Sequence, residues 1–281
     1  MKTPSDIFNF SRFSKFFVSD LKSCTSNFGL SFITLSAIIP LAAYIICILC
    51  NLTFNDGNWQ APGVIFRTFL LVITMICITI FMPVKCYGKL TEKNYGSFYL
   101  LIPASTLEKF LSMIILCAVI SPLVACSIYF LVDSLLCLVD PTCGDNVFYL
   151  ISNARKTIMD FVHELDMEDT SYLLNFAHNV SSPWLYLDDI FGASLPFLLG
   201  ALVFRRSKTA KTILSLIGIS IVFSILSAPF IDNFFETTFD NIDIFENDIF
   251  TNLPLIDTIS DTIVNLLFLA AIYFKLKTLK H

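Results

Sequence analysis

Residues Phe110–Val132 read FLSMIILCAVISPLVACSIYFLV, an apolar run without a charged side chain. A helix needs about 20 such residues to cross a bilayer, because the hydrocarbon core is about 30 Å thick and each residue adds about 1.5 Å. The 281-residue chain has a matching composition: 56% hydrophobic, 15% charged, 29 phenylalanines and a mean hydropathy of +0.75. Soluble domains carry about 25% charged residues. The composition therefore excludes a soluble enzyme, a nucleic-acid-binding module and a disordered tail.

Five further apolar stretches complete a set of six predicted spans. The six are Gly29–Leu52, Gly63–Met82, Phe110–Val132, Leu187–Phe204, Thr212–Ile231 and Ile256–Phe274. The fourth is the weakest, since it is short and begins with Asp188 and Asp189. Pro40 predicts a kink in the first span, which is also too long for the apolar core of a signal peptide. We expect an all-α, polytopic membrane protein in which residues 29–281 form one six-helix transmembrane domain.

Lysine and arginine gather on one side of this map. Fifteen of the 18 precede the first span, follow the sixth, or lie in the loops between spans two and three or four and five. The exceptions are Arg67, Arg155 and Lys156, and 19 of the 23 acidic residues share their side. Basic loops stay in the cytoplasm. We therefore expect a multi-pass protein of the cytoplasmic (plasma) membrane, the inner membrane where a cell has two, with both termini in the cytoplasm.

Residues 1–28 form an amphipathic segment before the first span. Its apolar positions recur at helical spacing: Ile7, Phe10, Phe13, Phe17 and Leu21. The opposite stripe is polar and carries Arg12, Lys15, Ser19 and Lys22. This pattern favours an interfacial helix with aromatic rings at the acyl boundary and cations toward anionic lipid. The alternative is a short solvated lead-in.

Residues 133–186 form the largest predicted outer element, an extracytoplasmic insertion with two short amphipathic helices. It contains Cys137 and Cys143, which we expect to pair if the compartment is oxidising. A second pairing concerns charges near the outer membrane surface. Arg67 in span two could form an ion pair with Asp257 or Asp261 at the outer end of span six, although snorkelling of Arg67 to the surface is the alternative.

The sequence carries no signature of catalysis. The HExxH and GxSxG motifs are absent, as is the phosphate-binding GxxxxGK[ST] loop, and the three histidines lie outside the spans. We therefore predict no enzyme activity and no catalytic, cofactor-binding or metal-binding residue. If the chain takes part in ATP-driven transport, the ATPase must be a separate polypeptide.

The loop before span three contains a helix-start signal. Ser105 and Glu108 have the spacing of a capping box, which predicts that the third helix begins at Ser105. Pro103 disfavours a helix that continues through this junction. The short apolar run before Pro103, residues 98–102, is too short to span a bilayer and predicts an element held against the inner membrane face.

These features resemble the permease subunits of ABC-2-type bacterial exporters. The most specific stretch is Tyr99–Lys109, YLLIPASTLEK, which is similar to the Leu-Leu-Pro-small-Ser segment before the third helix of such permeases. The resemblance implies a separate cytosolic ATP-binding subunit and a second permease chain in a homo- or heterodimer. It also implies that the ATPase docks on the coupling segment, which comprises Phe98, Tyr99, Leu100, Leu101, Pro103, Ser105 and Glu108.

The resemblance leaves the substrate unidentified, with a hydrophobic molecule as one option. Two other functions stay open on the sequence. One is a non-transport scaffold or immunity-type protein that binds a partner through its acidic outer region. The other is an ATP-independent channel or transporter. In each case the lipid bilayer is a partner and nucleic acid is not.

Overall fold

The computed structural model describes residues 8–54, 59–91, 99, 101–153, 156, 183–239 and 249–278. Within these ranges the protein is helical and contains no strand, as the sequence predicts. Five of the described helices are long and apolar enough to cross a membrane, one fewer than the six predicted spans. The architecture is compatible with a multi-pass membrane protein.

The first helix is a single rod that continues through the predicted boundary at residue 29. It comprises α2 (Phe10–Ile33), a π-helical segment η1 (Thr34–Ile38) and α3 (Ile39–Phe54). Asn9 caps its start by accepting hydrogen bonds from the backbone amides of Ser11 and Arg12. No separate interfacial helix is present among the described residues. Gly29 lies inside the rod, because a lone glycine costs a helix only about 1 kcal/mol.

The buried face of α2 differs from the predicted lipid-facing stripe. Its buried residues recur every three or four positions: Phe13, Phe16, Asp20, Cys24 and Phe28. This face packs against α4 and α6, whereas Phe10 is 73% exposed. Amphipathic periodicity cannot tell a membrane surface from a neighbouring helix, and here the neighbouring helices cover part of the stripe.

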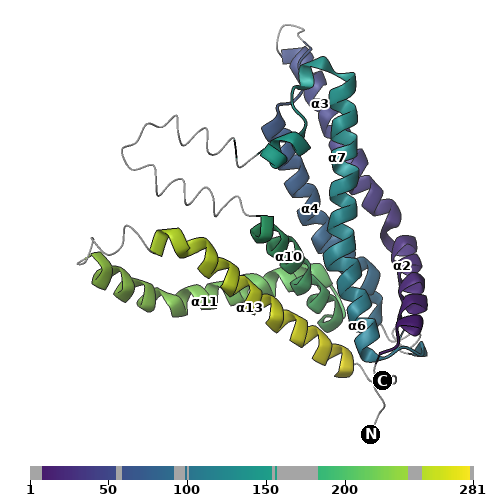
Figure 1. The fold of residues 1–281 in the computed structure, drawn as a ribbon, viewed down its shortest axis with the longest axis vertical. Helices are drawn as coiled ribbons and strands as arrows, with labels where there is room; N and C mark the ends of the chain where they lie inside the picture. The colour runs from purple at the N-terminus through teal and green to yellow at the C-terminus, as the bar shows by residue number, and fades with distance from the viewer. Residues whose placement is uncertain are drawn as a thin grey trace.

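The other two long rods lie alongside the first (Figure 1). One is α4 (Val64–Tyr87), which ends in the 3₁₀ turn η2 (Gly88–Thr91). The other joins α6 (Thr106–Ile114), the π-helical segment η3 (Ile115–Ile120) and α7 (Ser121–Val139), with the 3₁₀ turn η4 (Pro141–Cys143) after it. Residues 147–153, at the start of the predicted outer insertion, are helical. Most of that insertion lies outside the described residues.

Each π segment ends two residues before a proline, at Pro40 in the first rod and at Pro122 in the third. Proline has no backbone N–H and its ring crowds the carbonyl four residues earlier, so the regular helical ladder is interrupted there. A wider π turn accommodates this interruption without ending the helix. The kink predicted at Pro40 takes this form, and the rod changes direction between α2 and α3 (Figure 1).

Three more helices form a second group, α10 (Pro183–Val203), α11 (Lys208–Phe239) and α13 (Ile249–Thr278). α10 packs against both α4 and α13, while α11 and α13 run obliquely to the three rods (Figure 1). The fourth predicted span corresponds to α10, whose apolar part with described side chains, Phe191–Val203, is shorter than a span. Gly192 and Gly200 let α10 approach Asn265 and Thr212 closely, since a Cβ at either glycine would collide with those side chains.

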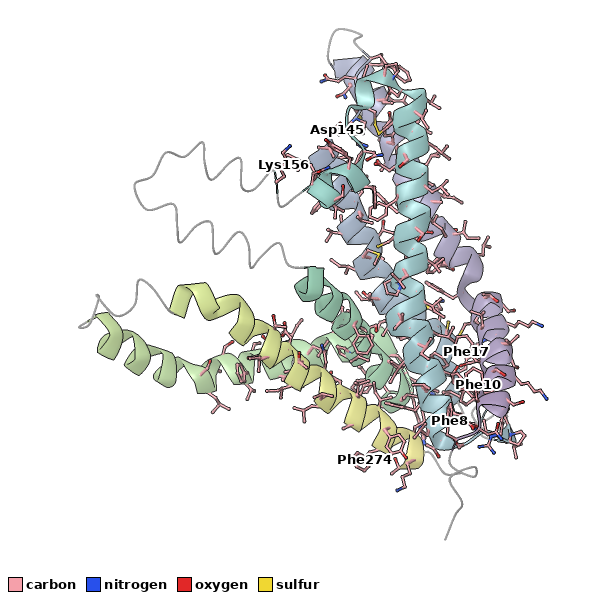
Figure 2. The ribbon with its side chains drawn as sticks, in the orientation of Figure 1. Phe8, Phe10, Phe17, Asp145, Lys156 and Phe274 are labelled. Atoms are coloured by element: carbon pink, nitrogen blue, oxygen red, sulfur yellow. A yellow bond between two sulfur atoms is a disulfide. The ribbon has the colours of Figure 1, made fainter. Side chains whose placement is uncertain are left out.

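The described chain begins and ends at the same end of the molecule (Figure 1). We call this the terminal end, formed by the start of α2, the start of α6 and the end of α13. Phe8, Phe10, Phe17 and Phe274 lie there, whereas Asp145 lies toward the opposite end (Figure 2). We call that the disulfide end, formed by the end of α3, the start of α4 and the end of α7. The largest buried apolar cluster joins α2, α4, α6, α10 and α13 around Tyr87, Met113 and Leu198.

Candidate functional site

One carboxylate holds together the beginnings of two helices at the terminal end. Glu108 is fully buried and accepts hydrogen bonds from the backbone amides of Ser105 and Asn9, each at 2.9 Å. The guanidinium of Arg12 donates to it at 2.8–3.0 Å through Nε and Nη2. Ser105 Oγ in turn accepts from the Glu108 amide at 3.2 Å. The capping box predicted from the sequence is confirmed, and its carboxylate also reaches α2.

A second carboxylate lies deeper between the same helices. Asp20 Oδ2 accepts hydrogen bonds from the Ser112 hydroxyl at 2.6 Å and from the Tyr87 phenol at 2.9 Å. These three buried residues lie on α2, α6 and α4 respectively. Buried polar groups impose geometry, because leaving either partner unsatisfied costs about 1–3 kcal/mol. The two carboxylates thus fix how α2, α4 and α6 meet.

The coupling segment divides into buried and exposed parts. Tyr99 packs its ring edge-on against Phe16 and Tyr87, with centroids 5.7 and 6.4 Å apart, and the ammonium group of Lys109 lies 5.6 Å from its centroid. Burial raises the pKa of the Tyr99 phenol well above its ordinary value. Its buried hydroxyl makes no hydrogen bond within the described part of the chain. Tyr99 is therefore partly buried, with its ring packed among α2, α4 and α6.

Two residues of the coupling segment are exposed within the described part of the chain. Leu101 is 73% exposed and Pro103 is also exposed. Phe98 and Leu100 lie outside the described residues. Ser105 and Glu108 act in the capping box, directly after this exposed stretch. Leu101 and Pro103 thus form an exposed surface directly before the capping box.

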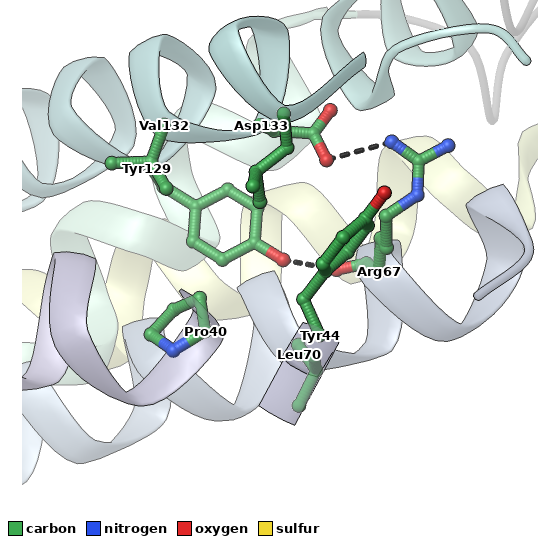
Figure 3. A pocket seen from close by; sticks show the side chains of 8 residues that line it. Pro40, Tyr44, Arg67, Leu70, Tyr129, Val132 and Asp133 are labelled. Carbon is green, nitrogen blue, oxygen red and sulfur yellow. Dashed lines mark hydrogen bonds and ion pairs between the residues drawn. The ribbon is translucent and has the colours of Figure 1, made fainter. Parts of the chain in front are cut away.

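At the disulfide end, Arg67 has a partner that the sequence analysis did not choose. Its Nη1 lies 2.7 Å from Asp133 Oδ1, and both side chains are buried (Figure 3). The predicted pairing with Asp257 or Asp261 on α13 is therefore replaced by one with α7. The physical reason is packing, because α4 lies against α7, whereas α13 packs on α10 and α6.

The remaining donors of Arg67 order the loop that follows α7. Its Nη2 donates to the backbone carbonyls of Cys143 and Asp145, at 2.9 and 2.7 Å, and its Nε donates to the carbonyl of Pro62 at 3.2 Å. A disulfide joins Cys137 to Cys143, the pair selected from the sequence. One guanidinium and one short disulfide loop therefore hold the end of α7 to the start of α4.

Asp140 forms the second polar centre of the disulfide end. It accepts hydrogen bonds from Tyr44 at 2.8 Å, from the indole of Trp59 at 2.9 Å and from the amide and hydroxyl of Thr142. Desolvation opposes its ionisation, but these hydrogen bonds outweigh it and lower the pKa of the Asp140 carboxyl to about 2. Asp140 links α3, the connection before α4 and the turn η4, a role that no spacing in the sequence signals.

A small pocket opens beside the Arg67–Asp133 pair (Figure 3). Its lining residues are Pro40, Tyr44, Arg67, Leu70, Tyr129, Val132, Asp133 and Leu136. Arg67 and Asp133 already neutralise each other, and the Tyr129 phenol donates to the Arg67 carbonyl at 2.5 Å. No cluster of metal-binding side chains occurs within the described ranges. The pocket lies between α3, α4 and α7.

Comparison with known proteins assigns no family. No family model, curated protein or solved structure matches the chain.

Proposed function

We propose that this chain is the membrane permease subunit of an ABC-2-type export system, powered by a separate cytosolic ATP-binding subunit. The observation that carries the proposal is the sharing of Glu108 by the starts of α2 and α6. A permease that takes its energy from another chain needs a surface where that chain pushes and a rigid element that transmits the push. The exposed residues Leu101 and Pro103, and the hydrogen bonds of Glu108 behind them, support this proposal.

The transmitting element is the hydrogen-bonded core behind the coupling segment. Leu101 and Pro103 are exposed immediately before the Ser105 cap, so displacing them displaces the start of α6. Because Glu108 holds Arg12 by a charge-assisted pair, α2 follows α6. Asp20 then links both helices to α4. A displacement of Leu101 and Pro103 would thus be transmitted to α6, α2 and α4.

The proposed arrangement places the terminal end in the cytoplasm and counts α10 as a sixth crossing. The basic residues at this end support that orientation. The apolar faces of α11 and α13 are exposed along most of their described length, which suits contact with lipid and with a second permease chain. The substrate stays unassigned, because the described surfaces show no polar site shaped for one.

The test isolates the exposed coupling leucine. The tagged full chain is purified from its native cells in mild detergent, and the co-purifying polypeptides are assayed for ATP hydrolysis. We expect a P-loop ATPase to co-purify, and Leu101→Ser to reduce its recovery at least fivefold. Leu138→Ser is the matched control, because Leu138 is 81% exposed at the disulfide end. The proposal fails if no ATPase co-purifies, or if both variants retain it equally.

If the chain is instead a scaffold or immunity-type protein, the opposite result is expected. Its activity would survive replacement of residues 99–103 by a neutral linker but would depend on the disulfide end. An ATP-independent channel or transporter would produce flux in liposomes that contain this chain alone.

A further inference from the structure

Two turns meet at the terminal end. One is η2, at the end of α4, and the other is the connection of residues 204–207 between α10 and α11. Lys208 Nζ donates to the carbonyl of Gly88, and Thr91 Oγ1 donates to the carbonyl of Phe204 at 3.3 Å. Gly88 permits this approach, since a Cβ there would lie 3.2 Å from the Lys208 side chain.

Four cations lie within a few residues of this junction along the chain, and we call them the basic corner: Lys85, Arg205, Arg206 and Lys211. All four side chains are exposed. Ser207 adopts a left-handed conformation, with φ of 51°, and so turns the chain sharply after the two arginines. The carboxylates described at this end, Asp20 and Glu108, are buried in the bonds given above. No described acidic side chain at this end is exposed to neutralise the corner.

The cations border exposed apolar side chains. Phe81 precedes Lys85 by one helical turn, Val203 lies two residues before Arg205, and Leu214 follows Lys211 by about one turn. All three are exposed, and Leu214 is 71% exposed. A surface that is cationic on one side and apolar on the other fits an amphiphile with an anionic head and apolar tails. An acidic protein would match the charges but not the apolar border.

We propose that the basic corner binds the headgroup of an anionic phospholipid, with the acyl chains lying along Phe81, Val203 and Leu214. An arginine guanidinium pairs with a phosphate through two parallel hydrogen bonds, which favours the arginine pair as the centre of the site. The first amides of α11, which have no helical partner, lie beside it and also favour an anion. A cation next to an anionic lipid surface changes affinity by about fivefold.

The test measures lipid binding to the full chain in detergent by native mass spectrometry. Dioleoyl phosphatidylglycerol and dioleoyl phosphatidylcholine are added separately, so that only the headgroup charge differs. The test variant is Arg205→Gln with Arg206→Gln. Its matched control is Lys15→Gln with Lys22→Gln, which removes two exposed cations from α2 at the same end. Lys85→Gln is a second, independent corner variant, and thermal unfolding without added lipid reports the folding of each protein.

We expect the wild-type chain to bind phosphatidylglycerol at least tenfold more tightly than phosphatidylcholine. The arginine variant should lose at least tenfold in phosphatidylglycerol affinity and Lys85→Gln about fivefold, with the control within twofold of wild type. Equal affinity for the two lipids would overturn the proposal, as would an equal loss in the arginine variant and the control. So would binding of polyglutamate through the arginine pair without lipid preference, which would assign the corner to an acidic protein.

Discussion

Arg67 on α4 and Asp133 on α7 form an ion pair of 2.7 Å in which the two side chains are 2% and 5% exposed. Removing one member of such a buried pair destabilises the fold, because the remaining charge keeps its desolvation penalty without its partner. Replacing both members by apolar residues of similar size removes that penalty. The pair therefore fixes which helices meet more than it adds net stability.

The first prediction separates these two effects. Arg67→Met alone should lower the free energy of unfolding by about 3–5 kcal/mol, whereas Arg67→Met with Asp133→Leu should recover more than half of that loss. Reversible unfolding in mixed detergent micelles, followed by circular dichroism, measures both. If the double variant is as unstable as the single one, the other hydrogen bonds of Arg67 dominate and the interpretation is wrong.

The second prediction concerns the start of α2. Glu108→Ala should remove the carboxylate shared by Asn9, Ser105 and Arg12, and should cost about 1–3 kcal/mol. Amide hydrogen exchange at residues 10–15 should accelerate about tenfold or more. Arg12→Gln is the milder comparison, since the Arg12 side chain is 37% exposed and its charge is screened by solvent. Unchanged exchange at the start of α2 in Glu108→Ala would contradict the linkage.

The third prediction follows from the low pKa of Asp140. The folded-state pKa is about 2, below the value of about 3.9 for an unfolded aspartate. The carboxylate therefore contributes stability that is fully present above pH 4 and is lost as the pH falls toward 2. Thermal unfolding midpoints between pH 2 and 5 should fall more steeply for wild type than for Asp140→Asn. Parallel curves for the two proteins would refute this assignment.

The fourth prediction tests the close approach of α10 to α11. Gly200→Ala places a Cβ against Thr212 and should destabilise the protein by about 1–3 kcal/mol. Gly218→Ala is the matched control on α11, because nothing lies within 4 Å of its Cβ position. It should stabilise the helix by about 0.5–1 kcal/mol. Equal effects of the two substitutions on the unfolding midpoint would argue against the packing of α10 on α11.

The sequence predicted features within one helix better than contacts between residues far apart in the chain. The capping box at Ser105 and the helical class of the chain depend on residues within one helix, so spacing alone predicts them. The partner of Arg67 depends instead on which helix packs beside α4. Asp133 and Asp261 both carry the right charge near a predicted outer surface, and only the packing of α4 against α7 selects Asp133.

The first helix shows a second limit of sequence patterns. The aromatic stripe of residues 1–28 predicts an apolar face but not what covers it. Phe16, which the stripe omitted, is buried, and Tyr99, which was expected to face a partner, packs on its ring. The contribution of Trp59 to Asp140 was missed for the same reason, because their 81-residue separation leaves no local signal.

The two π segments lie between the polar networks of the terminal and disulfide ends, and both contact α4. In each segment, which lies just before a proline, the backbone hydrogen bonds span five residues instead of four. Along the first and third rods, these wider turns separate the hydrogen bonds around Glu108 and Asp20 from those around Arg67 and Asp140.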